Sequence, residues 1–222
     1  MTQIRCSDES LCGRTRFLLV RHGQTDWNSE QRIQGHTDVP LNAEGLRQAA
    51  AMAERLASYE RAIAAIYSSD LRRARVTAEA IAHKYALNVT VDSNLREVYR
   101  GQAQGLLKAE YEARFGSVRR MLDETHADIA IRWNYSEVPD GEPRNSLIKR
   151  LHARMAEIAY DYDDRTVILV SHAGAIRTLI LASIVHDREL FDTYYAYPLA
   201  NCSIAEFVYS DGACTFKKMH EL

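Results

Sequence analysis

The segment FLLVRHGQTDWN, residues 17–28, places an arginine and a histidine directly after an apolar run. Phe17 to Val20 is typical of a buried strand, so we expect Arg21 and His22 at its carboxyl end, where open α/β sheets bind ligands. A neutral imidazole attacks phosphorus, and a guanidinium offers a planar fork of donors to phosphate oxygens. Gly23 permits close backbone approach. These residue types at this spacing indicate phosphoryl transfer, and an ordinary strand end is the alternative.

The segment TVILVSH, residues 166–172, repeats this arrangement later in the chain. An apolar strand again ends in a histidine, His172, and is followed by a turn of small residues, AGA, and an apolar helix to about Val185. A single histidine at a strand end is more often structural than catalytic. The pairing of two such strand ends in one chain favours function.

These side chains need a sheet to position them, and the rest of the sequence predicts one. Short strands are expected at 64–68 and 88–91. A helix capped by Asn42 is expected between the first two strands, with a buried stripe of Leu46, Ala49, Ala50, Ala53, Leu56 and Ala57. A second stripe predicts another helix at Ala74, Ala78, Ile81, Ala82 and Tyr85. A later helix, capped by Asn145 or Ser146, presents Leu147, Leu151, Met155 and Ile158.

This alternation of strands and helices predicts an α/β fold, a mostly parallel sheet with helices on both faces. The last two strands, SIAEFVYS and CTFKKMH, flank Asp211-Gly212, which is a strong signal for a two-residue hairpin. We therefore expect an antiparallel edge. Residues from about 106 to 145 fit the alternation less well and are expected to form a partly helical insertion that selects the substrate.

The composition predicts one domain and excludes several functions. The chain has 222 residues and a formal net charge of −2, which gives no basic field for nucleic acid or an anionic membrane. No segment approaches the roughly 20 apolar residues of a membrane span. We expect a cytoplasmic protein with a flexible N-terminal arm at 1–14 and a single domain at 15–222. Its cysteines lack a metal-type spacing and are expected to be reduced thiols: Cys6, Cys12, Cys202 and Cys214.

Four segments in order, VRHGQTDWN, SSDLRRARVTAE, LREVYRG and SHAG, resemble the signature motifs of the histidine phosphatase superfamily, also called phosphoglycerate mutase-like. The resemblance runs from about residue 16 to 210. It implies a three-layer α/β/α sandwich. It also implies that His22 is the nucleophile that forms a phosphohistidine, that Arg21, Arg73 and His172 form the phosphate pocket, and that Glu97 is the general acid.

The resemblance also assigns residues around the phosphate. The family arginine stands directly before Ala74, so Arg73 takes this role and Arg72 is expected on a solvated helix face. Asn28 resembles a residue that adds a hydrogen bond to phosphate, with a helix cap as the alternative. The remaining substrate-binding residues implied are Gly23, Thr25, Gln34, Gly35, Lys108, Ala173 and Gly174.

No metal site or cofactor is expected. The sequence contains neither an HExxH-type spacing nor a P-loop pattern. The remaining histidines have no motif support and are expected at the surface or in the core: His36, His83, His126, His152, His186 and His220. The only small-molecule requirement would be 2,3-bisphosphoglycerate, as a primer, if the chain were a mutase.

Within this resemblance the reaction divides after the phosphohistidine forms. Water attacks in a phosphatase, whereas a bound phosphoglycerate accepts the phosphoryl group in a mutase. RIQGHTDVPLNAEG resembles the phosphatases and favours hydrolysis of a small phosphorylated metabolite. In contrast, GLLKAEYEARFG resembles a mutase segment whose lysine maps onto Lys108, and Arg119 and Arg120 resemble the paired mutase arginines.

LREVYRG departs from the mutase pattern, with Tyr99 one position early and Arg100 in the tyrosine's place. We therefore expect a phosphatase, with a phosphoglycerate mutase interconverting 3- and 2-phosphoglycerate as the alternative. A domain that binds phosphorylated ligands without turnover is a second alternative. The oligomeric state is left open, with a homodimer among the alternatives.

Overall fold

The computed structural model describes residues 13–60, 62–125 and 129–220. Within them a single six-stranded sheet has the order β3-β2-β4-β1-β5-β6. The first four strands along the chain are parallel to one another. The fifth strand is antiparallel to β1, and the sixth is antiparallel to the fifth. The strands are β1 (Thr15–Arg21), β2 (Ala65–Ser68), β3 (Val89–Val91), β4 (Thr166–Ser171), β5 (Ile204–Ser210) and β6 (Ala213–His220). The predicted α/β fold with an antiparallel edge is confirmed.

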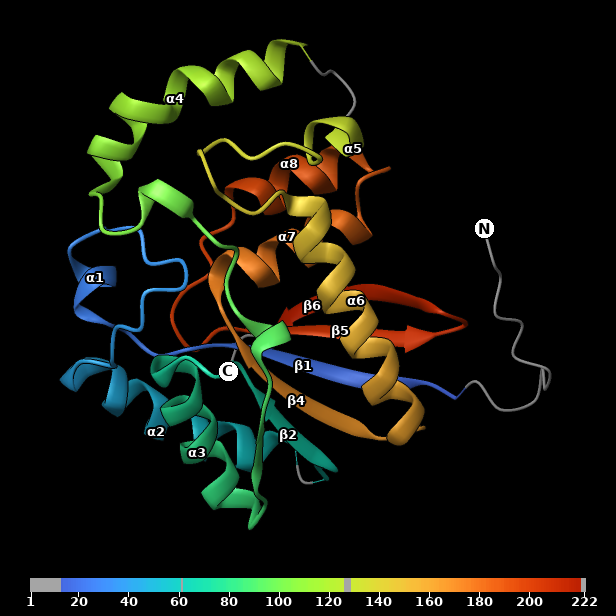
Figure 1. Cartoon of the computed structure of the whole chain (residues 1–222). Coiled ribbons are helices and arrows are strands. Elements are labelled where there is room, and N and C mark those ends of the chain that lie inside the picture. The colour runs from blue at the N-terminus through green and yellow to red at the C-terminus, as the bar shows by residue number, and fades with distance from the viewer. Residues whose placement is uncertain (1–12, 61, 126–128, 221–222) are drawn as a thin grey trace.

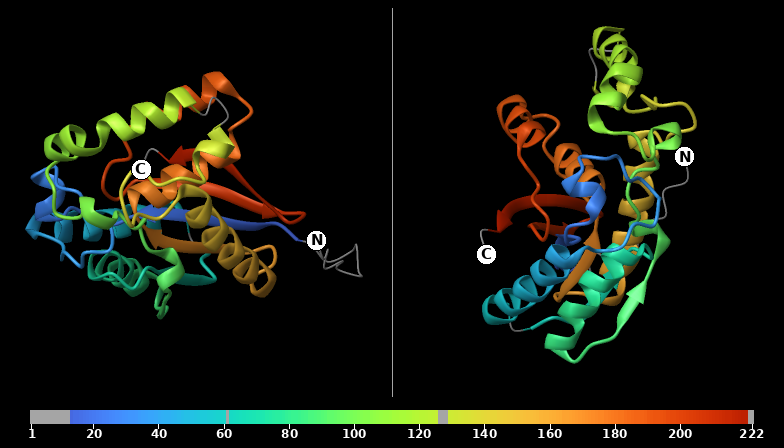
Figure 2. Two further views of the ribbon diagram at one scale, coloured as in Figure 1. Left: turned by 45° about the horizontal axis from the view of Figure 1, so that its top comes forward. Right: turned by 90° about the vertical axis from the view of Figure 1, so that its left-hand side faces the viewer.

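Helices cover both faces of this sheet, which gives the predicted three layers (Figures 1 and 2). Side chains of β1 alternate between the faces, and both sets are buried. Phe17 and Leu19 pack with α6 (Arg144–Asp161) and α7 (Ala173–Ser183). Leu18 and Val20 pack with α2 (Ala43–Tyr59) and α3 (Arg72–Tyr85). A continuous apolar run is what a strand covered on both faces requires.

The register of β1 and β4 brings the two histidines together. The strands are parallel neighbours, and Arg21 pairs with Ser171. The residues that follow this pair are His22 and His172, which therefore lie side by side at the same edge of the sheet. The backbone N–H of His22 still donates to the carbonyl of Ser171 at 3.1 Å, so the pairing continues to the histidine itself.

Turn and cap chemistry explains most of the element ends. Asp211 and Gly212 both have positive φ, as a two-residue hairpin between twisted strands requires. The side chain of Asn42 caps α2 by accepting the backbone N–H of Gly45 at 2.8 Å. The cap predicted at Asn145 or Ser146 is wrong, because Pro143, in extended conformation, occupies the cap position and α6 begins directly after it. Proline disfavours helical backbone at the residue before it, so the helix begins at this point.

The predicted buried stripe of α2 is also partly wrong. Leu46 is 52% exposed, and Ala50 is exposed as well. Gly45 and Met52 are buried in their place. The helix therefore turns a different face to the sheet than the apolar pattern predicts. Its backbone at Gly45 packs directly against the loop after β1, and a Cβ added to Gly45 would lie 2.0 Å from the carbonyl oxygen of Gln24.

Residues 106–145 contain α4 (Lys108–Thr125) and α5 (Ile129–Arg132), and α4 lies outside the three layers (Figure 1). Tyr111 and Phe115 of α4 form a small apolar cluster of their own with Ala103 and Val138. Residues 1–12 of the predicted N-terminal arm lie outside the described residues. Among the described helices, none combines the length and apolar character needed to cross a membrane. The remaining short elements are α1 (Asp26–Ser29), η1 (Ser93–Leu95), η2 (Gly101–Ala103) and α8 (Arg188–Ala196).

Candidate active site

His22 is buried at the carboxyl end of β1, with only 3% of its surface exposed. Its Nδ1 lies 2.7 Å from the carbonyl oxygen of Gly23, which can only accept. Nδ1 therefore carries the proton, and the lone pair of the neutral ring is on Nε2. Burial, and then the positive charges of Arg73 and Arg21, hold the pKa of His22 well below 6.5. The neutral, nucleophilic form predominates at neutral pH.

His172 lies directly beside His22, with the ring centroids 5.1 Å apart and the rings in an edge-on arrangement. The Nε–H of Arg73 donates to Nδ1 of His172 at 3.3 Å, so the neutral ring carries its proton on Nε2. This Nε2 is buried and has no hydrogen-bond partner among the described residues. Burial and the charge of Arg73 hold the pKa of His172 well below 6.5 too.

Arg73, in the first turn of α3, is completely buried. Its Nη1 and Nη2 donate to the carbonyls of Thr37 and Gly35, both at 2.8 Å. Gly35 adopts a φ of +57°, which turns this loop toward the arginine. Burial lowers the pKa of Arg73 to about 10, so it stays charged at neutral pH.

Arg21 completes the group of cations around His22. Its Nη1 donates to the carbonyl of Leu199, and its buried Nε has no partner among the described residues. The N–H of Arg21 Nε and the N–H of His172 Nε2 are thus two buried donors without acceptors. Buried polar groups are nearly always paired, so these two donors are suited to an acceptor bound at His22.

Glu97 follows η1 and faces the same site. Its Oε1 accepts the backbone N–H of Val98, and its Oε2 accepts that of Gly174, each at 2.8 Å. A Cβ on Gly174 would lie 2.4 Å from Oε1 of Glu97, so a larger residue there would displace this carboxyl group. The glycine of the SHAG segment therefore positions the carboxyl group against the start of α7.

A cavity of about 500 Å³ opens over His22. Most of the predicted site residues line it: Arg21, His22, Asn28, Gln34, Gly35, Arg73, Glu97, Lys108, Ala173 and Gly174. His172 lies behind this wall, against His22 and Arg73. Gly23 and Thr25, predicted to bind substrate, do not line the cavity. Gly23 instead packs against Gly45, and the Thr25 side chain caps α1 by accepting the N–H of Asn28 at 3.2 Å.

Asn28 takes part in the cap of α1 and also lines the cavity, so the structure combines the two predicted roles, a helix cap and a residue facing the phosphate. Its Oδ1 accepts the backbone N–H of Thr25 and the Nδ2–H of Asn201, both at 3.2 Å. Its Nδ2 is therefore left to face the cavity as a donor. Asn201 also donates to the carbonyl of His22 at 3.0 Å. No signal in the sequence indicated Asn201, because it comes from a loop after α8.

Sequence reasoning also missed the groups that hold Glu97. Arg150 of α6 donates to the Glu97 carbonyl at 2.9 Å and forms a two-pronged pair with Glu142. His36, expected to be an ordinary surface or core residue, has its Nε2 2.8 Å from the same carbonyl. Arg177 lines the cavity too, and its spacing from Ala173 and Gly174 on one helix could have revealed it.

The insertion contributes to the cavity through α4. Lys108 and Arg119 line it, whereas Arg120 does not. Arg119 is engaged by Glu112 through two bonds of 2.8 Å. Among the described residues, no three His, Cys, Asp or Glu side chains gather as metal ligands. The arrangement combines a neutral imidazole nucleophile, fixed cations for an anion, and a carboxyl group able to transfer a proton.

Comparison with known proteins gives the same family. A family model described as the histidine phosphatase superfamily (branch 1) matches residues 17–221. A metal-independent phosphoserine phosphatase of Arabidopsis thaliana is 38% identical over 169 residues, covering 75% of this chain and 68% of that protein. A probable phosphoglycerate mutase of Salmonella arizonae is 35% identical over 198 residues, covering 87% and 84%.

A solved structure is similar over nearly the whole length. The structure of a mycobacterial glucosyl-3-phosphoglycerate phosphatase has a TM-score of 0.75 and 30% sequence identity, covering 93% of this chain and 98% of that one. The similarity therefore extends beyond the four motifs to most of the fold.

Proposed function

The chain belongs to the histidine phosphatase superfamily and is an enzyme of the phosphatase or phosphoglycerate mutase-like type; from this premise we propose that it hydrolyses a small phosphorylated metabolite. In the first step Nε2 of His22 attacks phosphorus, the ester P–O bond breaks, and Glu97 gives its proton to the leaving oxygen. In the second step water attacks the phosphohistidine, Glu97 takes the proton, and the P–N bond breaks to release phosphate.

The observation that carries this proposal is the pair of unpaired buried donors beside the nucleophile. Arg21 Nε and His172 Nε2 have no acceptor among the described residues, although both are buried next to His22. A phosphoryl group bound at His22 would supply acceptor oxygens to both. Fixed donors of this kind stabilise the charge that develops on the equatorial oxygens without reorganisation during the reaction.

Hydrolysis needs water at the phosphohistidine, and the shape of the cavity favours its entry. The cavity over His22 continues into an outer region of about 750 Å³, which shares Arg21, Asn28 and Lys108 as lining residues. Arg21 and Arg73 already supply positive charge at the reacting group. We therefore propose that neither a metal ion nor a cofactor takes part.

A phosphoglycerate mutase is the second candidate function. Lys108 and Arg119, the residues that resemble mutase substrate contacts, both line the cavity. A mutase would bind a phosphoglycerate tightly enough to exclude water from the phosphohistidine and would need 2,3-bisphosphoglycerate as a primer. A domain that only binds phosphorylated ligands is disfavoured, because the nucleophile, both arginines and the carboxyl group are all present around the cavity.

Turnover of para-nitrophenyl phosphate in EDTA tests the proposed chemistry. We expect activity in the wild type, a fall to below about one thousandth in His22→Gln, and a phosphoenzyme that survives alkali but not acid after rapid quenching. His83→Gln is a matched control, because His83 is exposed on the outer surface of α3. An inactive wild type, or a phosphoenzyme that still forms in His22→Gln, would show that the proposed chemistry is wrong.

A second assay separates the two reactions. 3-Phosphoglycerate is supplied with a trace of 2,3-bisphosphoglycerate, and both phosphate release and 2-phosphoglycerate formation are followed. We expect phosphate release to dominate. Formation of 2-phosphoglycerate without phosphate would establish the mutase instead.

A further inference from the structure

The segment that carries Glu97 has no helix or strand of its own to hold it. Residues 96–100, which follow η1, lie outside the regular elements. A general acid must come within hydrogen-bond distance of the oxygen that it protonates, and a displacement of about 1 Å can reduce the rate about 100-fold. The place of Glu97 therefore depends on contacts from other elements.

One side chain of α6 contacts three carbonyls of this segment. Nη1 of Arg150 donates to the carbonyls of Asn94 and Arg96 at 2.6 and 3.0 Å. Its Nη2 donates to the carbonyl of Glu97 at 2.9 Å. Nε and Nη2 also donate to the two carboxylate oxygens of Glu142, at 2.8 and 2.9 Å. A guanidinium has five N–H groups, and these five bonds use all of them.

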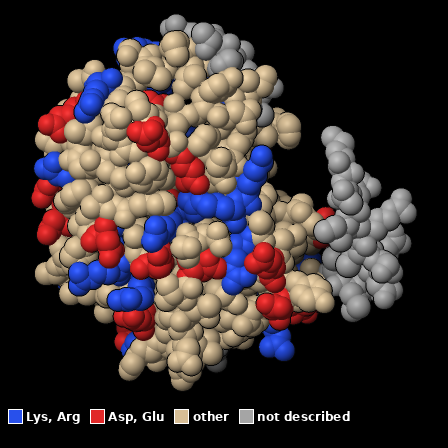
Figure 3. All heavy atoms as spheres, viewed as in Figure 1, with Lys and Arg blue, Asp and Glu red and all other residues tan. Residues whose placement is uncertain are grey.

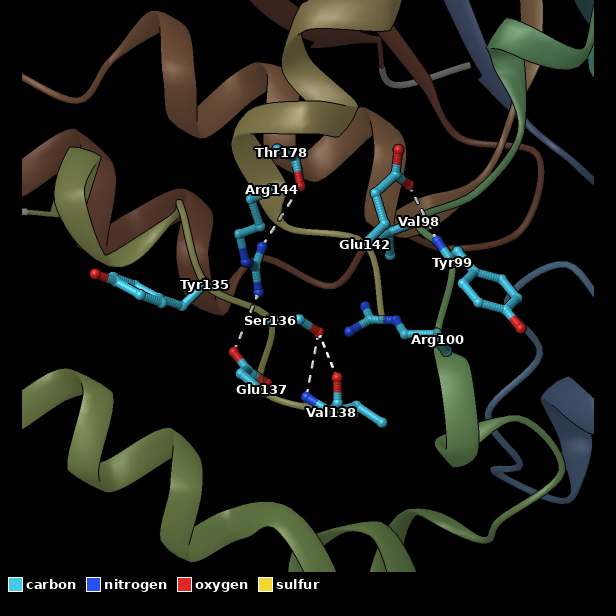
Figure 4. Close-up of a pocket in the computed structure, with 10 residues that line it drawn as sticks. All are labelled: Val98, Tyr99, Arg100, Tyr135, Ser136, Glu137, Val138, Glu142, Arg144 and Thr178. Atoms are coloured by element: carbon cyan, nitrogen blue, oxygen red, sulfur yellow. Dashed lines mark hydrogen bonds and ion pairs between the residues drawn. The ribbon is translucent and has the colours of Figure 1, made fainter. Parts of the chain in front are cut away.

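Glu142 fixes this guanidinium and joins it to the end of the insertion. Figure 4 shows its carboxylate turned toward the backbone of Tyr99, whose N–H it accepts at 3.1 Å. The backbone N–H of Glu142 in turn donates to the carbonyl of Tyr99 at 2.9 Å. Burial opposes its charge, but the bonds from Arg150 hold the pKa of Glu142 below its ordinary value. The charged pair therefore holds the chain on both sides of Glu97.

A neighbouring arginine of α6 provides a comparison. Arg154 lies one turn further along the helix, and its side chain is 22% exposed, against 20% for Arg150. It pairs with the carboxylates of Asp92 and Glu157. Arg150 instead directs three of its five donors to the backbone around Glu97. A partly buried ion pair contributes little net stability, so stability alone does not account for this arrangement.

We propose that Arg150, held by Glu142, is a positioning residue for proton transfer: it sets the place of the Glu97 carboxyl group in the cavity and so determines how well poor leaving groups are expelled. This inference rests on the proposed function, in which Glu97 protonates the leaving oxygen. A displaced Glu97 cannot reach that oxygen. Attack by His22 needs this proton much less when the leaving group departs as a stable anion.

The dependence on the leaving group tests this role. para-Nitrophenyl phosphate releases a stabilised phenolate, whereas phenyl phosphate has a similar shape and a more basic leaving oxygen. The measured quantity is kcat/KM, which reports the steps up to the phosphohistidine. In Arg150→Lys three donors replace five, and we expect kcat/KM to fall by about 30-fold or more for phenyl phosphate and by less than about threefold for para-nitrophenyl phosphate. Glu142→Gln keeps the size of the side chain but not its charge, and should widen the ratio of the two substrates by about 3- to 10-fold.

Two further variants separate positioning from a general structural role. Arg154→Gln is the matched control and should lower the Tm without changing the ratio of the two substrates. Glu97→Gln removes the acid and should widen the ratio at least as much as Arg150→Lys does. Arg150→Lys added to Glu97→Gln should widen it no further, because the group that it positions is already absent. Thermal melting verifies that each variant folds.

The outcomes that overturn the positioning role are specific. An unchanged ratio in both Arg150→Lys and Glu142→Gln overturns it, and so does an equal widening in Arg154→Gln. Further widening when Arg150→Lys is added to Glu97→Gln overturns it as well. A wild-type ratio in Glu97→Gln alone would instead contradict the proposed function, because the proton would then not come from Glu97.

Discussion

Two adjacent arginines, Arg72 and Arg73, have opposite environments. Arg73 is completely buried and donates to the carbonyls of Gly35 and Thr37. Arg72 is exposed, and its backbone N–H donates to Oδ1 of Asp38 at 2.7 Å. A helix turns by 100° per residue, so the side chains of Arg72 and Arg73 leave α3 in different directions. The motif resemblance distinguished the two residues, and the structure gives the physical reason.

Lysine substitution of each arginine tests this difference. In Arg73→Lys one ammonium replaces three donor nitrogens, leaving buried carbonyls and the phosphoryl group without their donors. We expect kcat for para-nitrophenyl phosphate to fall by about 100-fold and the free energy of unfolding to fall by about 2 kcal/mol. Arg72→Lys should behave as the wild type in steady-state assays and urea unfolding. Equal losses in both variants would contradict the assignment.

At the level of elements, the loop after β1 is fixed by the close approach of α2. A Cβ on Gly45 would lie 2.0 Å from the carbonyl oxygen of Gln24, and a Cβ on Gly23 would lie 2.5 Å from that of Gly45. The two glycines are needed for backbone contact, since neither has positive φ. The loop that carries His22 is therefore held by the end of a helix rather than by its own turn.

Gly45→Ala should displace this loop. We expect the free energy of unfolding to fall by about 1–3 kcal/mol and kcat to fall as well, because backbone cannot give way as a flexible side chain can. Gly116→Ala on α4 is the control, since its Cβ would approach only the ends of flexible side chains, Oε2 of Glu112 at 3.1 Å and Nη1 of Arg120 at 3.5 Å. That change should raise the free energy of unfolding by about 0.5 kcal/mol. Urea unfolding of both variants makes the comparison, and a loss of equal size in each would refute the close-approach argument.

At the level of the whole molecule, the small net charge conceals an uneven distribution. The chain has a formal charge of −2, yet the wall of the cavity over His22 contains eight Lys and Arg residues and two glutamates. On the face shown in Figure 3, by contrast, basic side chains lie beside acidic ones. Arg150 pairs with Glu142 and Arg154 pairs with Asp92, and none of these four residues lines the cavity. Positive charge is concentrated at the cavity over His22, so attraction of an anion would be local.

The buried histidines should make global stability depend on pH. The pKa values of His22 and His172 are lowered by burial, so the unfolded chain takes up protons at a higher pH than the folded one. Below about pH 6.5 the free energy of unfolding should therefore decrease as the pH falls, by about 1 kcal/mol or more per pH unit. The His22→Gln/His172→Gln double variant should show a shallower dependence in urea titrations at pH 7.5 and 5.5. An equal dependence in both proteins would show that these histidines do not titrate as inferred.

The sequence by itself determined the fold class and most of the strands and helices, and its resemblance to the histidine phosphatase motifs indicated the group of residues brought together around His22. Continuous apolar runs can be satisfied only in a covered sheet, and short motifs at strand ends require a common edge. These properties are local or periodic, so one chain segment at a time reveals them. The α6 cap and the face of α2 were predicted wrongly, because Pro143 and Gly45 act through geometry that apolar periodicity does not record.

Only the tertiary structure decided how distant residues complete the site. Asn201 orients Asn28, Arg150 holds the backbone of Glu97, and Arg100 meets Arg144 within one cavity. The partners in these contacts are separated by dozens of residues and follow no repeating pattern. Their meeting depends on how α6, the 196–203 loop and the insertion pack around the sheet edge, since contacts between remote segments are set by packing rather than by local propensity.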